Sequence, residues 1–373
     1  MQTTQIYYAP ASQIRWKQVW SLIALDVAIV ISWIAYHKYQ PNLLQQFGFK
    51  QFAFQLAIVQ GIILFLTPPI AGLIADRIRQ RSKERLPVIN VGINVVSMVF
   101  MAVAFTIFVN PTGWITAIFP LMIVLWLVSM NIFHSPAISM VEVFVPVDRL
   151  PLVVALLAVV TGLAEATEPI ISDVIDFFGA PITFAAGGAL VFLTGWLLQK
   201  STQAMEGEPP PSTDPSVPAV VSKLWLVFLL GLGLGAATAF FFNVAPALAD
   251  AKLPFLAANK IKGNFFVSLL IAGSALLTFP MSWLATKQGT VRMATLGFVG
   301  VFTLMGLMYF LSGGILVEAS FFLYPFAFST IAVTALPIAF SNISQAQKVL
   351  GVGLFFSGVE LVNSIIEVLQ AAG

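Results

Sequence analysis

The sequence predicts an all-α, polytopic membrane protein with about eleven membrane-spanning helices, and three observations support this class. Of the 373 residues, 59% are hydrophobic and only 9% are charged, whereas about a quarter of the residues of a soluble globular domain are charged. The apolar residues fall in repeated runs of about 20, the length that a helix needs to cross a hydrocarbon core about 30 Å thick. The alternation over about ten residues that is typical of β-barrel strands does not occur in these runs.

The expected spans form two sets separated by one polar segment. The first six are expected near residues 18–37, 52–75, 87–109, 114–141, 150–176 and 181–199, and the next five near 223–248, 262–286, 290–311, 315–341 and 348–369. Segment 201–222 contains five prolines and three acidic residues, a composition typical of a flexible linker. We therefore expect an N-terminal six-helix bundle over 1–200 and a C-terminal bundle of about five helices over 223–373.

Basic residues are distributed unequally between the two sides of this topology. Thirteen of the 18 Lys and Arg residues lie on the side of the N-terminus and the linker, and five lie on the other side. The positive-inside rule then predicts a cytoplasmic N-terminus, and the odd number of spans predicts an external C-terminus. We expect an integral protein of a bacterial-type inner membrane or an equivalent membrane, in contact with membrane lipid.

Composition and motifs argue against several other classes of protein. The formal net charge of +2 produces no field that would attract nucleic acid. With no cysteine and only His37 and His134 as histidines, neither a metal cluster nor a cofactor is expected. The chain shows no nucleophile beside a base and no phosphate-binding loop, and no extramembrane segment is long enough to hold a catalytic domain. An enzyme is therefore not expected.

A short motif after the second predicted span resembles a known transporter signature. Residues 72–77 read GLIADR, with further basic residues at 79, 81 and 83, and this segment resembles the loop between helices 2 and 3 of the major facilitator superfamily. The resemblance implies two pseudo-symmetric bundles that expose a central site to each side in turn. It implies a gating role for Gly72, Asp76, Arg77 and Arg81. The alternative is that the basic residues only anchor the orientation of the chain.

Within this superfamily, several segments look most like the glycoside and sucrose/proton symporter branch. They are TPPIAG at 67–72, ERLP at 84–87, NIFHSPAI at 131–138 and the stretch 335–351. The branch usually carries an arginine where this chain has His134 and an aspartate where it has Val143, which leaves Glu142 one position early. A usual twelfth helix is missing. The resemblance implies proton-coupled uptake of a sugar or glycoside.

Ionisable residues inside the spans are expected to face a cavity or a partner, because an ionised side chain at mid-membrane costs at least about 2.5 to 3.5 kcal/mol. They fall in the spans that line the central cavity of the superfamily. Asp176, eleven residues after Glu165, extends an acidic stripe along one face of span 150–176. The candidates for coupling or substrate binding are Asp26, His134, Glu142, Glu165, Glu168, Glu360 and Asn363. Buried structural hydrogen bonds, such as one from Ser21 to a protonated Asp26, are the alternative for these residues.

Two functions are consistent with these features. The first is a secondary active transporter that moves a small polar organic solute, such as a sugar or glycoside, by alternating access with proton or cation coupling. The second is a non-transporting membrane subunit or assembly factor that holds a protein, lipid or pigment. In that case a partner helix is expected against the C-terminal bundle. We favour transport.

Overall fold

The computed structural model describes residues 13–46, 48–49, 53–82, 86–109, 118–146, 149–203 and 221–372, and these residues form helices and no strand. The helices of the first half are α1 (Trp16–Gln46), α2 (Ala53–Ser82), α3 (Leu86–Val109), α4 (Phe119–Ser139), α5 (Val141–Phe144), α6 (Leu150–Ala166), α7 (Glu168–Phe178) and α8 (Ala180–Gln203). Those of the second half are α9 (Leu224–Ala239), a π-helical segment (Phe240–Val244), α10 (Ala245–Lys252), α11 (Pro254–Ala258), α12 (Gly263–Gln288), α13 (Thr290–Phe310), α14 (Ile315–Ser341), a 3-10 turn (Gln345–Gln347) and α15 (Lys348–Ala372).

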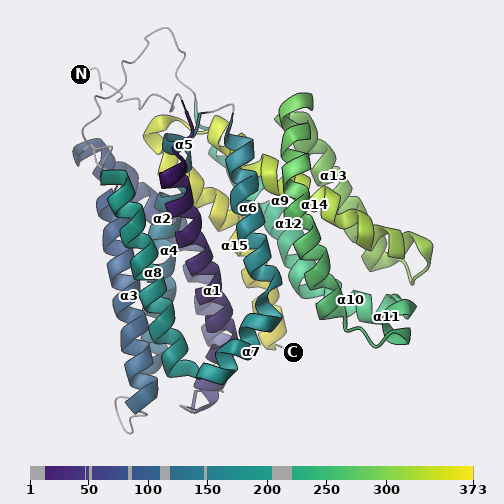
Figure 1. The fold of residues 1–373 in the computed structure, drawn as a ribbon, viewed down its shortest axis with the longest axis horizontal. Coiled ribbons are helices and arrows are strands. Elements are labelled where there is room, and N and C mark those ends of the chain that lie inside the picture. Colours follow the sequence, from purple (N-terminus) through teal and green to yellow (C-terminus); the bar gives the residue numbers. More distant parts are fainter. Residues whose placement is uncertain are drawn as a thin grey trace.

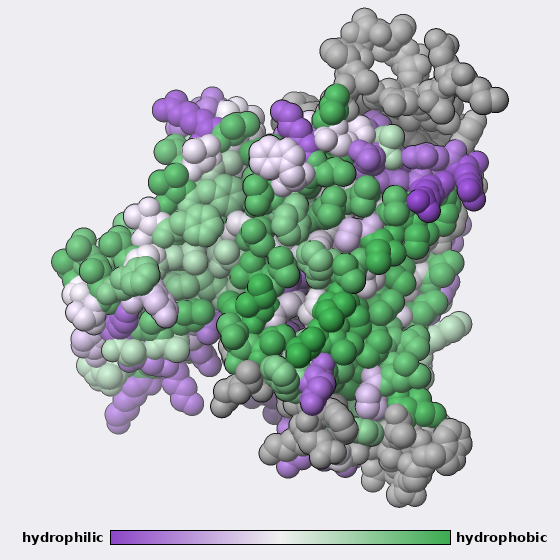
Figure 2. Space-filling view, turned by 180° about the vertical axis from the view of Figure 1, so that it is seen from behind, coloured by the Kyte–Doolittle hydropathy of each residue, from purple (hydrophilic) through white to green (hydrophobic). Residues whose placement is uncertain are grey.

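The predicted number of spans is confirmed. Ten helical segments among the described residues are long and apolar enough to cross a membrane, and the bent pair α6–α7 brings the number to eleven when it counts as one span. On the face shown in Figure 2, apolar side chains cover the middle of the molecule, and hydrophilic side chains gather toward its two ends. Such a face matches the lipid-facing surface expected of a polytopic membrane protein.

The helices gather into two groups, with α1 to α8 on one side and α9 to α14 on the other (Figure 1). One hydrophobic core lies within residues 19–198 and a second within 237–331. A third cluster joins the groups, since Ile138 and Val154 of the first half pack with residues of the second. Most of the predicted linker, residues 204–220, lies outside the described residues.

The two ends of the long helices can be distinguished by charge. We call the end at which α1 and α15 begin the basic face, because the arginines at the end of α2 lie there, and we call the opposite end the far face. Helix α15 ends toward the far face (Figure 1). The prediction that the basic face is cytoplasmic remains a prediction.

Two spans depart from the continuous helices that the sequence predicts. Span 150–176 is broken into α6 and α7, which meet at 60°. Pro169 explains the break, because it has no N–H to donate to the carbonyl of Glu165 one turn earlier. The prediction of an acidic stripe along one face of this span is therefore wrong, because Asp176 lies beyond the bend and pairs with Lys38 at 2.7 Å. Span 223–248 contains the π-helical segment 240–244, which ends two residues before Pro246.

Candidate functional site

A cavity of about 800 Å³ lies between the two groups of helices, in the half of the molecule toward the far face. Its walls come from α1, α2, α6 and α7 on one side and from α9, α10, α12 and α15 on the other. Lys262, at its rim, is exposed. The volume lies within the range of about 300 to 1,000 Å³ that is typical of sites for small organic molecules.

Carboxyl groups dominate the polar lining of this cavity. Four predicted site residues line it: Glu165, Glu168, Glu360 and Asn363. Glu367 adds a further carboxyl, while His37 and Lys262 are the basic side chains of the lining. Asn363 lies one helical turn after Glu360 and lines the same cavity. This arrangement can bind a solute through several hydrogen bonds and can take up protons or cations.

Two other predicted residues meet at the boundary between α1 and α4. His134 Nε2 lies 3.4 Å from Asp26 Oδ1, and both side chains are largely buried. The His134 ring also packs against the ring of Phe356 on α15, with centroids 4.6 Å apart. The Ser21 hydroxyl donates to the Lys17 carbonyl and not to Asp26. The Asp26–His134 pair thus links the N-terminal group of helices to α15.

A hydrogen-bonded chain that sequence reasoning missed reaches the cavity from α1. The Tyr36 hydroxyl donates to Gln60 Oε1 at 2.8 Å, and Gln60 Nε2 donates to Glu367 Oε2 at 2.7 Å. Glu367 lies seven residues after Glu360, so the helical repeat places both carboxyls on one face of α15. That spacing could have identified Glu367, whereas Gln60 carried no signal beyond being a polar residue within an apolar run.

At the basic face, the motif residues hold α2 against the start of α15. Asp76 accepts the backbone N–H groups of Val349 at 3.2 Å and Leu350 at 2.9 Å, so a side chain of one bundle caps a helix of the other. The negative charge also suits the positive end of that helix dipole. At Gly72, a Cβ atom would lie 2.5 Å from the Val349 carbonyl oxygen, which explains why only glycine fits there.

The arginines of the motif do not act alike. Arg79 lies 3.3 Å from Asp76 and its guanidinium donates to the carbonyl of Gln345, so it reinforces the cap. Arg77 and Arg81 are exposed, a placement that suits contact with solvent or lipid headgroups. Arg79 therefore has the contacts expected of a gating residue, although the prediction named its two neighbours.

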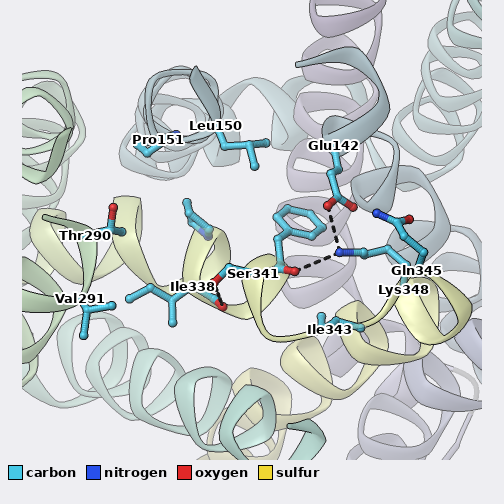
Figure 3. Close-up of a pocket in the computed structure, with 12 residues that line it drawn as sticks. Glu142, Leu150, Pro151, Thr290, Val291, Ile338, Ser341, Ile343, Gln345 and Lys348 are labelled. Carbon is cyan, nitrogen blue, oxygen red and sulfur yellow. Dashed lines mark hydrogen bonds and ion pairs between the residues drawn. The ribbon is translucent and has the colours of Figure 1, made fainter. Parts of the chain in front are cut away.

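Glu142 lies at the basic face, away from the cavity. Figure 3 shows Lys348 reaching from the start of α15 toward Glu142 of α5, with their charged atoms 2.9 Å apart. Lys348 also donates to the Phe340 carbonyl at 2.9 Å, and its side chain is only 2% exposed. A pocket of about 300 Å³ borders this pair, with Leu150 on its other wall. Glu142 thus joins the two halves of the chain at the closed end.

Within the described part of the chain, no three His, Asp or Glu side chains converge closely enough to hold a metal ion. The carboxyls of the cavity are instead spread over α6, α7 and α15.

Solved transporter structures share this architecture over almost its whole length. The human organic anion transporter MFSD10 (TETRAN) matches with a TM-score of 0.66 and 12% identity, over 96% of this chain and 93% of that chain. A bacterial homologue of the iron transporter ferroportin, in an outward-facing state with soaked iron, matches with a TM-score of 0.63 and 13% identity, over 95% and 91%. No family model and no curated protein matches the sequence. The chain has the two-bundle fold of major facilitator transporters.

Proposed function

We propose that this protein is a secondary active transporter that moves a small polar organic solute by alternating access. The observation that carries the proposal is the cavity of about 800 Å³ between the bundles. It reaches the far face, whereas the basic face is held closed by the Asp76 cap on α15 and by the Glu142–Lys348 pair. A site that is accessible from one side only is what one half of an alternating-access cycle requires.

The acids of the cavity supply the proposed proton or cation coupling. Glu360 and Glu367 line the cavity from α15, and Glu165 and Glu168 line it from α6 and α7. Asp26 of α1 pairs with His134 of α4 at 3.4 Å. Protonation of one member of such a group changes the charge that the others and a bound solute experience. Solute affinity is thereby coupled to proton uptake.

The lining also favours one sign of substrate charge. Four carboxyls face the cavity, against His37 and Lys262, so neutral or cationic solutes suit it better than anions. The resemblance to the sucrose/proton symporter branch makes sugars and glycosides the first neutral solutes to test. The rings of Trp33 and Phe242 in the wall can pack against the apolar face of a sugar or against a cationic group.

Uptake into proteoliposomes with an imposed proton gradient tests this function. We expect solute accumulation in the wild type and its loss in Asp26→Asn and Glu360→Gln, which remove the charge but keep the shape. Glu318→Gln is a matched control, because Glu318 lies in the first turn of α14 and outside the cavity lining. Accumulation that is unchanged in both Asp26→Asn and Glu360→Gln would rule out these acids as coupling groups.

A groove on the second bundle supports a non-transporting subunit as a second candidate function. About 560 Å³ of space lies between α9 and α13, lined by Leu226, Leu229, Phe298, Phe302 and Val362 among others. The groove lies between the first and third spans of the second bundle, α9 and α13. At the corresponding place in the first bundle, the sixth span, α8, packs against both α1 and α3. Purification in mild detergent discriminates the two: a stoichiometric partner favours the subunit, and a monomer stabilised by a solute favours transport.

A further inference from the structure

Helices α2 and α15, which belong to different bundles, touch along their whole length. At the basic face the contact is the Asp76 cap on α15. In the middle, the Ser357 hydroxyl donates to the Phe65 carbonyl at 2.6 Å. At the far face, Gln60 donates to Glu367 at 2.7 Å. The seam between these helices is therefore closed at both ends, although the cavity opens toward the far face.

Small residues allow this close approach. A Cβ atom on Gly353 would lie 2.3 Å from the Pro68 carbonyl oxygen, so the two backbones are in direct contact there. Gly61 lies close to the side chain of Ser364, and a Cβ atom built on Gly61 would lie 3.0 Å from the Ser364 Cβ. Gly61 and Gly72 are eleven residues apart, which is about three helical turns and places them on one face of α2.

The far end of the seam is fixed by an oriented amide. The Gln60 side chain is buried, with 3% of its surface exposed. Because the Tyr36 hydroxyl occupies its oxygen, its NH₂ group must point the other way, toward Glu367. The hydrogen bonds of Gln60 to Tyr36 and Glu367 therefore join three helices, α1, α2 and α15. A buried amide with both ends satisfied is costly to pull apart.

The other seam between the bundles, α6 against α12, behaves differently. Near the basic face it is closed, since the Thr278 hydroxyl donates to the Ala155 carbonyl at 3.3 Å. Toward the far face, the chain turns by 60° between α6 and α7. Beyond this turn, Ser172 of α7 and Asn264 of α12 both line the cavity. We place the mouth of the cavity here, because no hydrogen bond joins α7 to α12 among the described residues, unlike α2 and α15.

From this asymmetry we propose that the far end of the α2–α15 seam is a pivot. It stays paired throughout the transport cycle, while the mouth between α7 and α12 opens and closes. At the basic face the same two helices part when the cavity turns to that side. The inference rests on the proposed transport function, because a pivot has meaning only if the bundles alternate.

The natural absence of cysteine allows a direct test by disulfide cross-linking. The pair Gly61→Cys and Ser364→Cys joins the far end of the seam, where a small shift brings the Cβ atoms to the spacing of a disulfide. The pair Gln80→Cys and Ala346→Cys joins α2 to the 3-10 turn just before α15 at the basic face, where the native side chain of Gln80 donates to the Ala346 carbonyl at 3.1 Å. None of these four residues lines the cavity.

We expect oxidation of the far-end pair to leave uptake close to that of the reduced protein, and oxidation of the basic-face pair to abolish it reversibly. Loss of uptake on oxidation of the far-end pair, restored by reduction, would overturn the pivot.

Spin-label distances provide a readout that needs no transport. Labels at the far end of the seam are placed on exposed positions, Ile58→Cys of α2 and Ile365→Cys of α15, and this far-end pair should give one distance population in lipid. Labels at Ser172→Cys and Asn264→Cys should give two. Two populations at the far-end pair would overturn the pivot even if uptake had never been observed. Absence of uptake in the wild type, with one population at the far end and two at the mouth, would count against transport but not against the pivot.

Discussion

At the scale of single residues, the contact between the bundles depends on a few buried polar side chains. Asp76 has a nearly buried carboxylate, with 4% of its side chain exposed, and it satisfies two N–H groups at the start of α15. Such orphan donors cost free energy when nothing accepts from them. A single carboxylate therefore stabilises the closed basic face.

Replacing this cap should loosen the closed face. Asp76→Ala is expected to cost about 0.5 to 2 kcal/mol of stability, the usual value of a helix cap, and to increase labelling of an introduced Ala346→Cys by a water-soluble maleimide. Arg77→Ala is the control, because Arg77 is exposed on the same helix turn. Equal melting temperatures and equal labelling for the two variants would contradict the capping role.

Lys348 and Glu142 allow a second prediction at this scale. Because the Lys348 side chain is only 2% exposed, Glu142→Gln leaves a buried ammonium without its carboxylate, a change that typically costs about 3 to 5 kcal/mol. Adding Lys348→Met removes the unpaired charge, so the double variant should recover part of the loss. Thermal unfolding of both single variants and the double variant in one detergent measures this. Additive losses would show that the pair is not coupled.

At the scale of elements, the bend at Pro169 in span 150–176 shapes the cavity. The sequence predicts one continuous span, whereas the structure bends it by 60° and places Glu165 and Glu168 at the bend, inside the cavity wall. A proline was visible in the sequence, but membrane helices also accommodate proline without breaking. Packing of α7 against α1, with Asp176 paired to Lys38, therefore acts together with Pro169 in selecting the bend.

Restoring the missing N–H should straighten this span. Pro169 lies in the first turn of α7, where proline costs little, whereas in a straight, continuous span it would cost about 3 kcal/mol. Pro169→Ala removes this penalty from the straight form and allows a hydrogen bond to the Glu165 carbonyl. The distance between spin labels on Ser172→Cys and Asn264→Cys should change, and uptake should fall. Pro254→Ala is the control, because Pro254 opens α11, where a first-turn proline costs little. An unchanged distance in Pro169→Ala would show that tertiary packing alone holds the bend.

At the scale of the whole molecule, the two halves meet along unequal seams, and the cavity between them is acidic. Its lining carries Glu165, Glu168, Glu360 and Glu367 against Lys262 and His37. The charge of the whole chain, +2, conceals this local excess of acid. The sign of the cavity therefore comes from the arrangement of helices and not from composition.

This sign leads to a prediction about ligands. In a thermal-shift screen of purified protein, neutral and cationic organic solutes should stabilise it, and anions of similar size should not. A ligand at about 100 times its Kd adds about 2.7 kcal/mol. The shift should shrink in Glu360→Gln but not in Glu318→Gln. Stabilisation by anions alone would contradict the assignment of the cavity.

The sequence by itself determined the class of protein, the number of spans and the helices that carry charge. These follow from local quantities: a run of about 20 apolar residues spans a bilayer wherever it occurs, and a charge inside such a run needs a partner or water. Gly72 and Asp76 were also identified from the sequence, and in the structure both lie against α15. Whether any site residue acts in coupling stays a prediction.

Only the tertiary structure decided which polar groups meet. The pairing of His134 with Asp26, of Glu142 with Lys348 and of Gln60 with Glu367 joins helices that are distant in the sequence. Nothing in one helix specifies its neighbour's register, because in lipid the contact is set by close packing of small residues rather than by burial of apolar surface. The closed α2–α15 seam and the one-sided mouth of the cavity are consequences of that packing.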